Sequence, residues 1–259
     1  MMSSDRIRVS HGRDGVSRIT LDFPERKNAL DPVAVLALTN ALGECDNEES
    51  TRVIIIAGAG GAFCAGGDIG SFGTISDTRV RRRGARLVDA LLGVEKPLIA
   101  RVEGAAVGLG LTIALLADFT VAADNAKFGD PHVGLGAVAG DGVAIILPLL
   151  VGPQRAKDLL MTGRIIDAAE AYRIGMILSS VPLDRLDREV ESLAQRLIEQ
   201  PPYAMRATKV ALNRTIKSAA RDVLDLALAY EEFSRTLPDH AEAVKAWKTK
   251  RASSSPKSE

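Results

Sequence analysis

The sequence predicts a mixed α/β fold. Short apolar segments typical of buried strands lie in the first half of the chain, whereas helical patterns dominate the second half. Two of the apolar segments, 53–57 and 98–102, lead directly into glycine-rich turns that are followed by helical patterns. These repeated strand–turn–helix units are the basis of the fold prediction.

The first predicted strand covers residues 16–22. Its side chains alternate, so that Ser17, Ile19 and Leu21 would lie on one face of a sheet. Pro24 follows the segment and ends it.

A helix is predicted to begin after Asp31. Its side chain can accept hydrogen bonds from the first turn, and Pro32 suits the first helical position. We expect this helix to extend to about residue 45. A buried strand is predicted at 51–57, a glycine-containing loop at 70–78 and a helix at 79–92.

The rest of the chain is predicted to contain two more strands and then mainly helices. The strands cover 98–102 and 119–122. The helices are expected over 143–150, 153–161, 168–174, 183–199, 203–216, 220–236 and 240–250. We expect a core in residues 1–183, a helical region in 184–251 and a disordered tail rich in Ser and Lys in 252–259.

The composition excludes several functional classes. The 259 residues have a formal net charge of +0 and 4% aromatic content, which argues against nucleic acid as a partner. Two cysteines, Cys45 and Cys64, indicate a reducing compartment. The amino-terminal segment lacks an apolar signal core, and no stretch approaches the roughly 20 apolar residues of a membrane span. We therefore expect a cytoplasmic protein without a membrane partner.

The two glycine-rich turns are the clearest functional signal. The first is Gly61-Ala62-Phe63-Cys64-Ala65-Gly66-Gly67-Asp68, and the second is Gly104-Ala105-Ala106-Val107-Gly108-Leu109-Gly110. Glycine lets the backbone adopt unusual dihedrals and approach a ligand closely. The first N–H groups of a helix are unpaired and lie at the positive end of its dipole. Two such turns that converge would bind an oxyanion.

These turns and further motifs resemble the crotonase superfamily, the enoyl-CoA hydratase/isomerase family. The similarity covers nearly the whole chain. The matching positions include Pro24, Asn28-Ala29-Leu30, both glycine turns, Lys96-Pro97, Ala126-Lys127-Phe128-Gly129, Thr162-Gly163, Glu170, Phe233, Glu242, Trp247 and Lys250-Arg251.

The resemblance implies a spiral of ββα repeats with a helical C-terminal region that forms homotrimers, often paired into hexamers. It implies an acyl-CoA thioester as substrate, with CoA as part of that substrate and no separate cofactor. The two oxyanion-binding N–H groups of the family fall on Gly67 and Leu109, where they would stabilise a thioester enolate.

The chain departs from the hydratase pattern at two positions. Thr112 and His132 occupy the places of the two glutamates that handle water and the proton in hydratases. His132 with the later Asp141 is similar to the arrangement in a superfamily member that hydrolyses a carbon–carbon bond of a β-diketone. Asp141 can equally cap the helix over 143–150. Asp130 is expected to orient the turn before His132.

Several reactions therefore stay open. We prefer chemistry based on His132, either carbon–carbon hydrolysis or an altered hydration or dehydration. The alternatives are an enoyl-CoA isomerase and a catalytically silent subunit that binds acyl-CoA.

The family comparison also implies CoA contacts. Lys250 matches a lysine that reaches the 3′-phosphate, often across a subunit boundary. Arg26 and Lys27 lie near the nucleotide contact, and the carbonyl groups around Cys64 and Ala65 would accept from the adenine amino group. The scattered histidines show no zinc-ligand spacing and no dinucleotide fingerprint is present, so we expect no metal and no redox cofactor.

Overall fold

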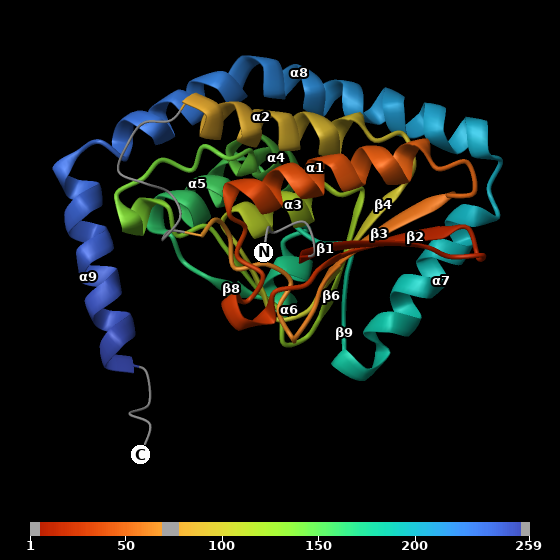
Figure 1. Ribbon diagram of the computed structural model, residues 1–259, viewed down its shortest axis with the longest axis horizontal. Coiled ribbons are helices and arrows are strands. Elements are labelled where there is room, and N and C mark those ends of the chain that lie inside the picture. Colours follow the sequence, from red (N-terminus) through yellow and green to blue (C-terminus); the bar gives the residue numbers. More distant parts are fainter. Residues whose placement is uncertain (1–5, 69–77, 255–259) are drawn as a thin grey trace.

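A six-stranded sheet forms the centre of the part of the chain that the structure describes, and helices pack on both of its faces (Figure 1). The computed structural model describes residues 6–68 and 78–254. The strand order is β1 (Ile7–His11), β2 (Val16–Leu21), β3 (Val53–Gly58), β4 (Leu98–Val102), β6 (Phe119–Ala123) and β9 (Ser179–Val181). β1 and β2 are antiparallel, and the other neighbours pair in parallel. The predicted mixed α/β class is confirmed.

A second, smaller sheet lies beside the first. Its strands are β5 (Ala105–Val107), β7 (Lys127–Gly129) and β8 (Ile166–Asp167), with β5 parallel and β8 antiparallel to β7. None of these strands is predicted from the sequence pattern, and neither is β1 or β9. β5, β7, β8 and β9 have only two or three residues each, too few to show an alternating pattern.

The helices before the C-terminal region largely follow the predicted segments. They are α1 (Pro32–Asn47), α2 (Thr78–Gly93), α3 (Leu109–Leu116), α4 (Val143–Val151), α5 (Pro153–Thr162) and α6 (Ala168–Arg173). Asp31 caps α1 as predicted, because its carboxylate accepts from the backbone N–H groups of Val33 and Ala34 at 2.9 and 2.8 Å. Apart from its last residue, the loop predicted at 70–78 lies outside the described residues.

Both faces of the large sheet are buried, but in separate cores. Along β3, Ile54 and Ile56 face the main core, whereas Val53 and Ile55 belong to a smaller core. The smaller core is covered by α7 (Leu186–Ile198). A strand buried on both faces is apolar at every position, and this explains the unbroken apolar run in the sequence.

The C-terminal region consists of two long helices, α8 (Pro202–Ser234) and α9 (Pro238–Ser254). α8 packs along α2 and α4, and α9 extends away from the sheets (Figure 1). The two helices predicted at 203–216 and 220–236 are wrong as separate elements, because residues 217–219 contain no glycine or proline to end the first one. Of the predicted tail, residues 252–254 continue α9 and 255–259 lie outside the described part. None of the described helices has the length and apolar character needed to cross a membrane.

Candidate active site

The two glycine-rich turns lie against each other. The backbone N–H of Cys64 donates to the carbonyl of Ala105 at 2.8 Å, and Val107 N–H donates back to the carbonyl of Cys64 at 3.0 Å. Gly110 makes this approach possible, since a Cβ atom there would lie 2.2 Å from the Cys64 carbonyl oxygen. The turns therefore converge, as the sequence analysis expects.

Gly67 and Leu109 each place a backbone N–H at this junction. Leu109 is the first residue of α3, so its N–H has no partner within the helix. Around Gly67, Leu30 N–H donates to Gly66 O at 2.8 Å and Asp68 N–H donates to Leu30 O at 2.9 Å. Neither the Gly67 nor the Leu109 N–H donates to another backbone group in the described part of the chain. Two unpaired donors at neighbouring turns form an arrangement suited to an oxyanion.

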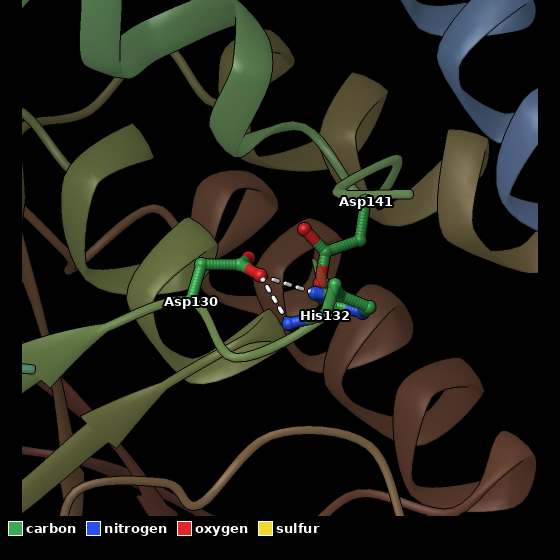
Figure 2. Close-up of side chains that lie close together, drawn as sticks. All are labelled: Asp130, His132 and Asp141. Atoms are coloured by element: carbon green, nitrogen blue, oxygen red, sulfur yellow. Dashed lines mark hydrogen bonds and ion pairs between the residues drawn. The ribbon is translucent and has the colours of Figure 1, made fainter. Parts of the chain in front are cut away.

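His132 stands beside this junction. A methyl group placed on Gly108 would lie 3.7 Å from His132 Cε1 and 3.8 Å from the Cα of Gly66, so the ring is adjacent to the residues that precede both proposed donors. The ring follows β7, and Nδ1 donates to Asp130 Oδ1 at 2.5 Å (Figure 2). The same oxygen accepts from the His132 backbone N–H at 3.0 Å. Asp130 therefore orients the turn, as expected, and also the imidazole.

Asp141 has a different partner from the one expected. Its Oδ1 accepts from the Thr112 hydroxyl at 2.8 Å, and both side chains are buried. The carboxylate that bonds to Nδ1 of the His132 ring belongs to Asp130, only two residues away along the chain, and not to Asp141. The capping alternative is wrong: α4 begins at Val143 after Gly142, without a side-chain cap.

The residues expected to bind the nucleotide of CoA are partly brought together. Ala65 N–H donates to the carbonyl of Lys27 at 2.9 Å, and Arg26 pairs with Asp68 at 2.5 Å. The carbonyl of Cys64 accepts from the second turn, at the backbone N–H of Val107. Lys250 lies on α9, but its side chain is outside the described part.

Comparison with known proteins assigns the chain to a family. The sequence profile of enoyl-CoA hydratase/isomerase matches residues 11–254. The chain belongs to the enoyl-CoA hydratase/isomerase family. It is 31% identical to an enoyl-CoA hydratase/isomerase from Mycobacterium paratuberculosis, whose crystal structure it matches with a TM-score of 0.87 over 93% of this chain and 98% of that one. The predicted crotonase fold is thereby confirmed.

Relatives within the family have names that denote different reactions. The chain is 38% identical over 205 residues to crotonyl-CoA hydratase of Syntrophomonas wolfei subsp. wolfei, covering 76% of this chain and 78% of that protein. It is 32% identical to 1,2-epoxyphenylacetyl-CoA isomerase of Escherichia coli, over 94% of this chain and 96% of that protein. Membership of the enoyl-CoA hydratase/isomerase family therefore does not specify the reaction, which depends on the residues of the site.

The electrostatics of the site are set by buried carboxylates around His132. Burial alone would lower the pKa of this histidine, but the hydrogen bond from its ring to Asp130 and the charges of Asp130, Asp141 and Glu231 raise the pKa to about 10. Burial and the neighbouring acids raise the pKa of Asp141, while His132 and the Thr112 hydroxyl oppose the rise. These charges therefore favour the protonated form of the ring, which can donate a proton.

Glu231 is a neighbour of His132 that the sequence pattern does not reveal. It lies on α8, is 7% exposed, and its Oε1 is 3.7 Å from His132 Nε2. A signal was present: Leu224, Leu228 and Glu231 occur at helical spacing on the buried side of α8. An acidic residue in an apolar stripe indicates a buried partner, although the pattern does not identify which one.

The same cluster raises the question of a metal ion. Asp130, His132 and Asp141 present ligand atoms that all lie within 4.8 Å of one another. A metal would have to replace the proton shared by His132 and Asp130, and a protonated ring has no free lone pair to offer. A proton and a metal ion would therefore compete for this site.

Proposed function

We propose that this protein is an enzyme that converts acyl-CoA thioesters through an enolate. The thioester oxygen would accept hydrogen bonds from the N–H groups of Gly67 and Leu109. The observation that carries this proposal is the pair of unpaired N–H groups beside His132, in a chain of the enoyl-CoA hydratase/isomerase family. Removing one such donor typically costs about 3 kcal/mol of transition-state stabilisation.

We further propose proton transfer at the carbon next to the thioester as the reaction class. The raised pKa of His132 favours a role as proton donor, and Asp141 supplies a carboxylate with a raised pKa, as a base working near neutral pH needs. Two reactions suit His132 as the acid and Asp141 as the base. One is isomerisation of an enoyl-CoA, and the other is hydration or dehydration with this pair in place of two glutamates. Hydrolytic carbon–carbon cleavage fits less well, because it would require a neutral His132 to activate water.

Exchange of substrate protons tests this proposal directly. In D₂O, butyryl-CoA should gain deuterium at the carbon next to the thioester, as measured by mass spectrometry, because an enolate can be reprotonated by solvent-derived deuterons. Leu109→Pro should remove the exchange, since proline is tolerated at the first helical position but carries no N–H. Leu109→Ala is the matched control for the lost side chain.

The opposite result identifies the rival function. Calorimetry that detects butyryl-CoA binding without any deuterium exchange, and without turnover of enoyl-CoA or 3-hydroxyacyl-CoA, would contradict the enzymatic proposal. The chain would then be a silent acyl-CoA-binding subunit.

The proposed assembly is a homotrimer or a hexamer. Large apolar side chains are exposed along α8: Leu212, Leu226, Tyr230 and Phe233. Together with α9, which extends from the core, they offer surface for contacts between subunits. Light scattering at micromolar concentration measures the assembly, and a monomer would refute it.

A further inference from the structure

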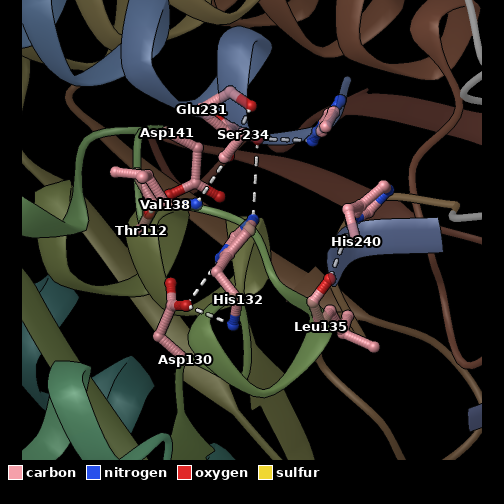
Figure 3. A network of polar contacts seen from close by, with 10 residues as sticks. Thr112, Asp130, His132, Leu135, Val138, Asp141, Glu231, Ser234 and His240 are labelled. Atoms are coloured by element: carbon pink, nitrogen blue, oxygen red, sulfur yellow. Dashed lines mark hydrogen bonds and ion pairs between the residues drawn. The ribbon is translucent and has the colours of Figure 1, made fainter. Parts of the chain in front are cut away.

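The junction between α8 and α9 contacts the loop that carries His132. Val138 N–H donates to the Ser234 hydroxyl at 3.1 Å, and His240 Nδ1 donates to the carbonyl of Leu135 at 2.7 Å (Figure 3). A Cβ atom on Gly136 would lie 2.8 Å from the backbone nitrogen of His240. Two polar contacts and one close backbone approach thus hold residues 135–138 against the C-terminal helices.

Glu231 extends this contact into the site itself. Its Oε1 lies 3.7 Å from His132 Nε2 and also pairs with Arg235, the residue that follows α8. Gly140 leaves room for the side chain, because a Cβ atom there would lie 2.6 Å from Glu231 Oε2 and 2.7 Å from Glu231 Cβ. The loop is therefore shaped to admit this glutamate.

The ring of His132 lies between two carboxylates from different parts of the chain. Asp130, after β7, takes the Nδ1 side, and Glu231 faces the Nε2 side. Asp141, before α4, is the third charged neighbour and is held by Thr112 of α3.

The charge of Glu231 acts on the ring at close range and in a buried setting. The side chains of His132 and Glu231 are 15% and 9% exposed, so water screens their attraction weakly. Arg235 pairs with the same Oε1 atom of Glu231 and competes with the ring for it.

We propose that Glu231 is a positioning residue that keeps His132 in its proton-carrying state, so that the site is complete only when the end of α8 is docked. The inference rests on the proposed function for its catalytic meaning. The state of the ring itself can be measured without substrate.

The test follows the titration of His132 by NMR of its Cε1–H group. The chain has three histidines, and loss of one signal in His132→Gln assigns the resonance. Glu231→Gln keeps the size of the side chain but removes its charge, so the pKa of His132 should fall by about 1 or more. Asp225→Asn, at an exposed position on the same helix, is the control and should leave the titration unchanged.

A second variant should shift the titration in the opposite direction. Arg235→Gln removes the competing cation, so the pKa of His132 should rise. An unchanged His132 titration in folded Glu231→Gln would overturn the proposal. If Glu231→Gln does not fold, an unchanged or lowered pKa in Arg235→Gln would overturn it.

Activity provides a separate readout. If the wild-type protein exchanges substrate protons, the alkaline limb of its pH–rate profile should move to lower pH in Glu231→Gln, by as much as the NMR titration moves. If the wild-type protein exchanges no protons while the titration shifts as expected, the proposed function fails and the role of Glu231 stands.

Discussion

The hydroxyl of Thr112 donates to Asp141 across 2.8 Å inside the protein. Thr112 thus acts here as a hydrogen-bond donor to a carboxylate from another element. A buried carboxylate is thereby held beside Thr112.

Thr112→Val should reveal this dependence. The substitution keeps the shape but leaves the buried Asp141 without its donor, so the free energy of unfolding should fall by about 1–3 kcal/mol in urea titrations. Loss of the donor should also raise the pKa of Asp141 further and move the corresponding limb of the pH–rate profile to higher pH. Thr112→Ser keeps the hydroxyl and is the control. Equal stability of both variants would contradict the prediction.

Hydration of crotonyl-CoA should be slow. The family resemblance implies that Thr112 and His132 take the places of both hydratase glutamates, and a positioned acid or base is worth roughly 10²–10⁴-fold in rate. We expect a rate at least ~10²-fold below that of a family member with both glutamates. Side-by-side assays at matched pH measure this, and comparable rates would refute it.

His132 and Asp130 should act as a unit. His132→Ala should remove most activity, and Asp130→Asn should lower the rate because an amide cannot stabilise the imidazolium as a carboxylate does. The double variant should be hardly slower than His132→Ala alone, since groups that act together have non-additive effects. If the rate losses of the two single variants multiply in the double variant, Asp130 only orients the turn.

The contribution of His132 to the free energy of unfolding should decrease as the pH becomes alkaline. The folded protein holds the ring proton up to about pH 10, whereas an ordinary histidine releases it near 6.5. The contribution is therefore complete below pH 6.5 and disappears as the pH rises to 10, with a slope of at most about 1.4 kcal/mol per pH unit. The difference in unfolding free energy between wild type and His132→Gln should shrink over this range. A constant difference between pH 6 and pH 10 would contradict the raised pKa.

Binding of CoA should depend on Lys250. Lys250→Ala should weaken the affinity measured by calorimetry, and the loss should shrink at high salt, where the contact with the phosphate is screened. Lys245→Ala, at an exposed position on α9, provides the control. Unchanged affinity of Lys250→Ala at low salt would rule out the contact.

Features with local causes are the ones that the sequence predicts well. Asp31 followed by Pro32 begins a helix wherever it occurs, because the cap and the proline act within one turn. The glycines of the two turns likewise indicate close approach and free N–H groups from their own neighbourhood. The strand over 53–58 is evident because both of its faces are buried.

Features that depend on distant contacts are only partly predictable. The sequence places His132 near Asp141 along the chain, but only the fold shows that the ring bonds to Asp130 and that Asp141 bonds to Thr112. Glu231 is 99 residues from His132 along the chain, and no local pattern specifies that pairing. The pairing of the Glu231 carboxylate with the His132 ring depends on how α8 packs over α4.

The position of α8 late in the chain has a consequence for how the protein is made. Asp130, His132 and Asp141 leave the ribosome 90 residues or more before Glu231 does. At usual rates of synthesis this interval lasts about ten seconds. During that time the loop around His132 lacks both its third carboxylate and its cover. The nascent chain can therefore build its sheet early, but the charge state of the site is acquired only when the last helices arrive.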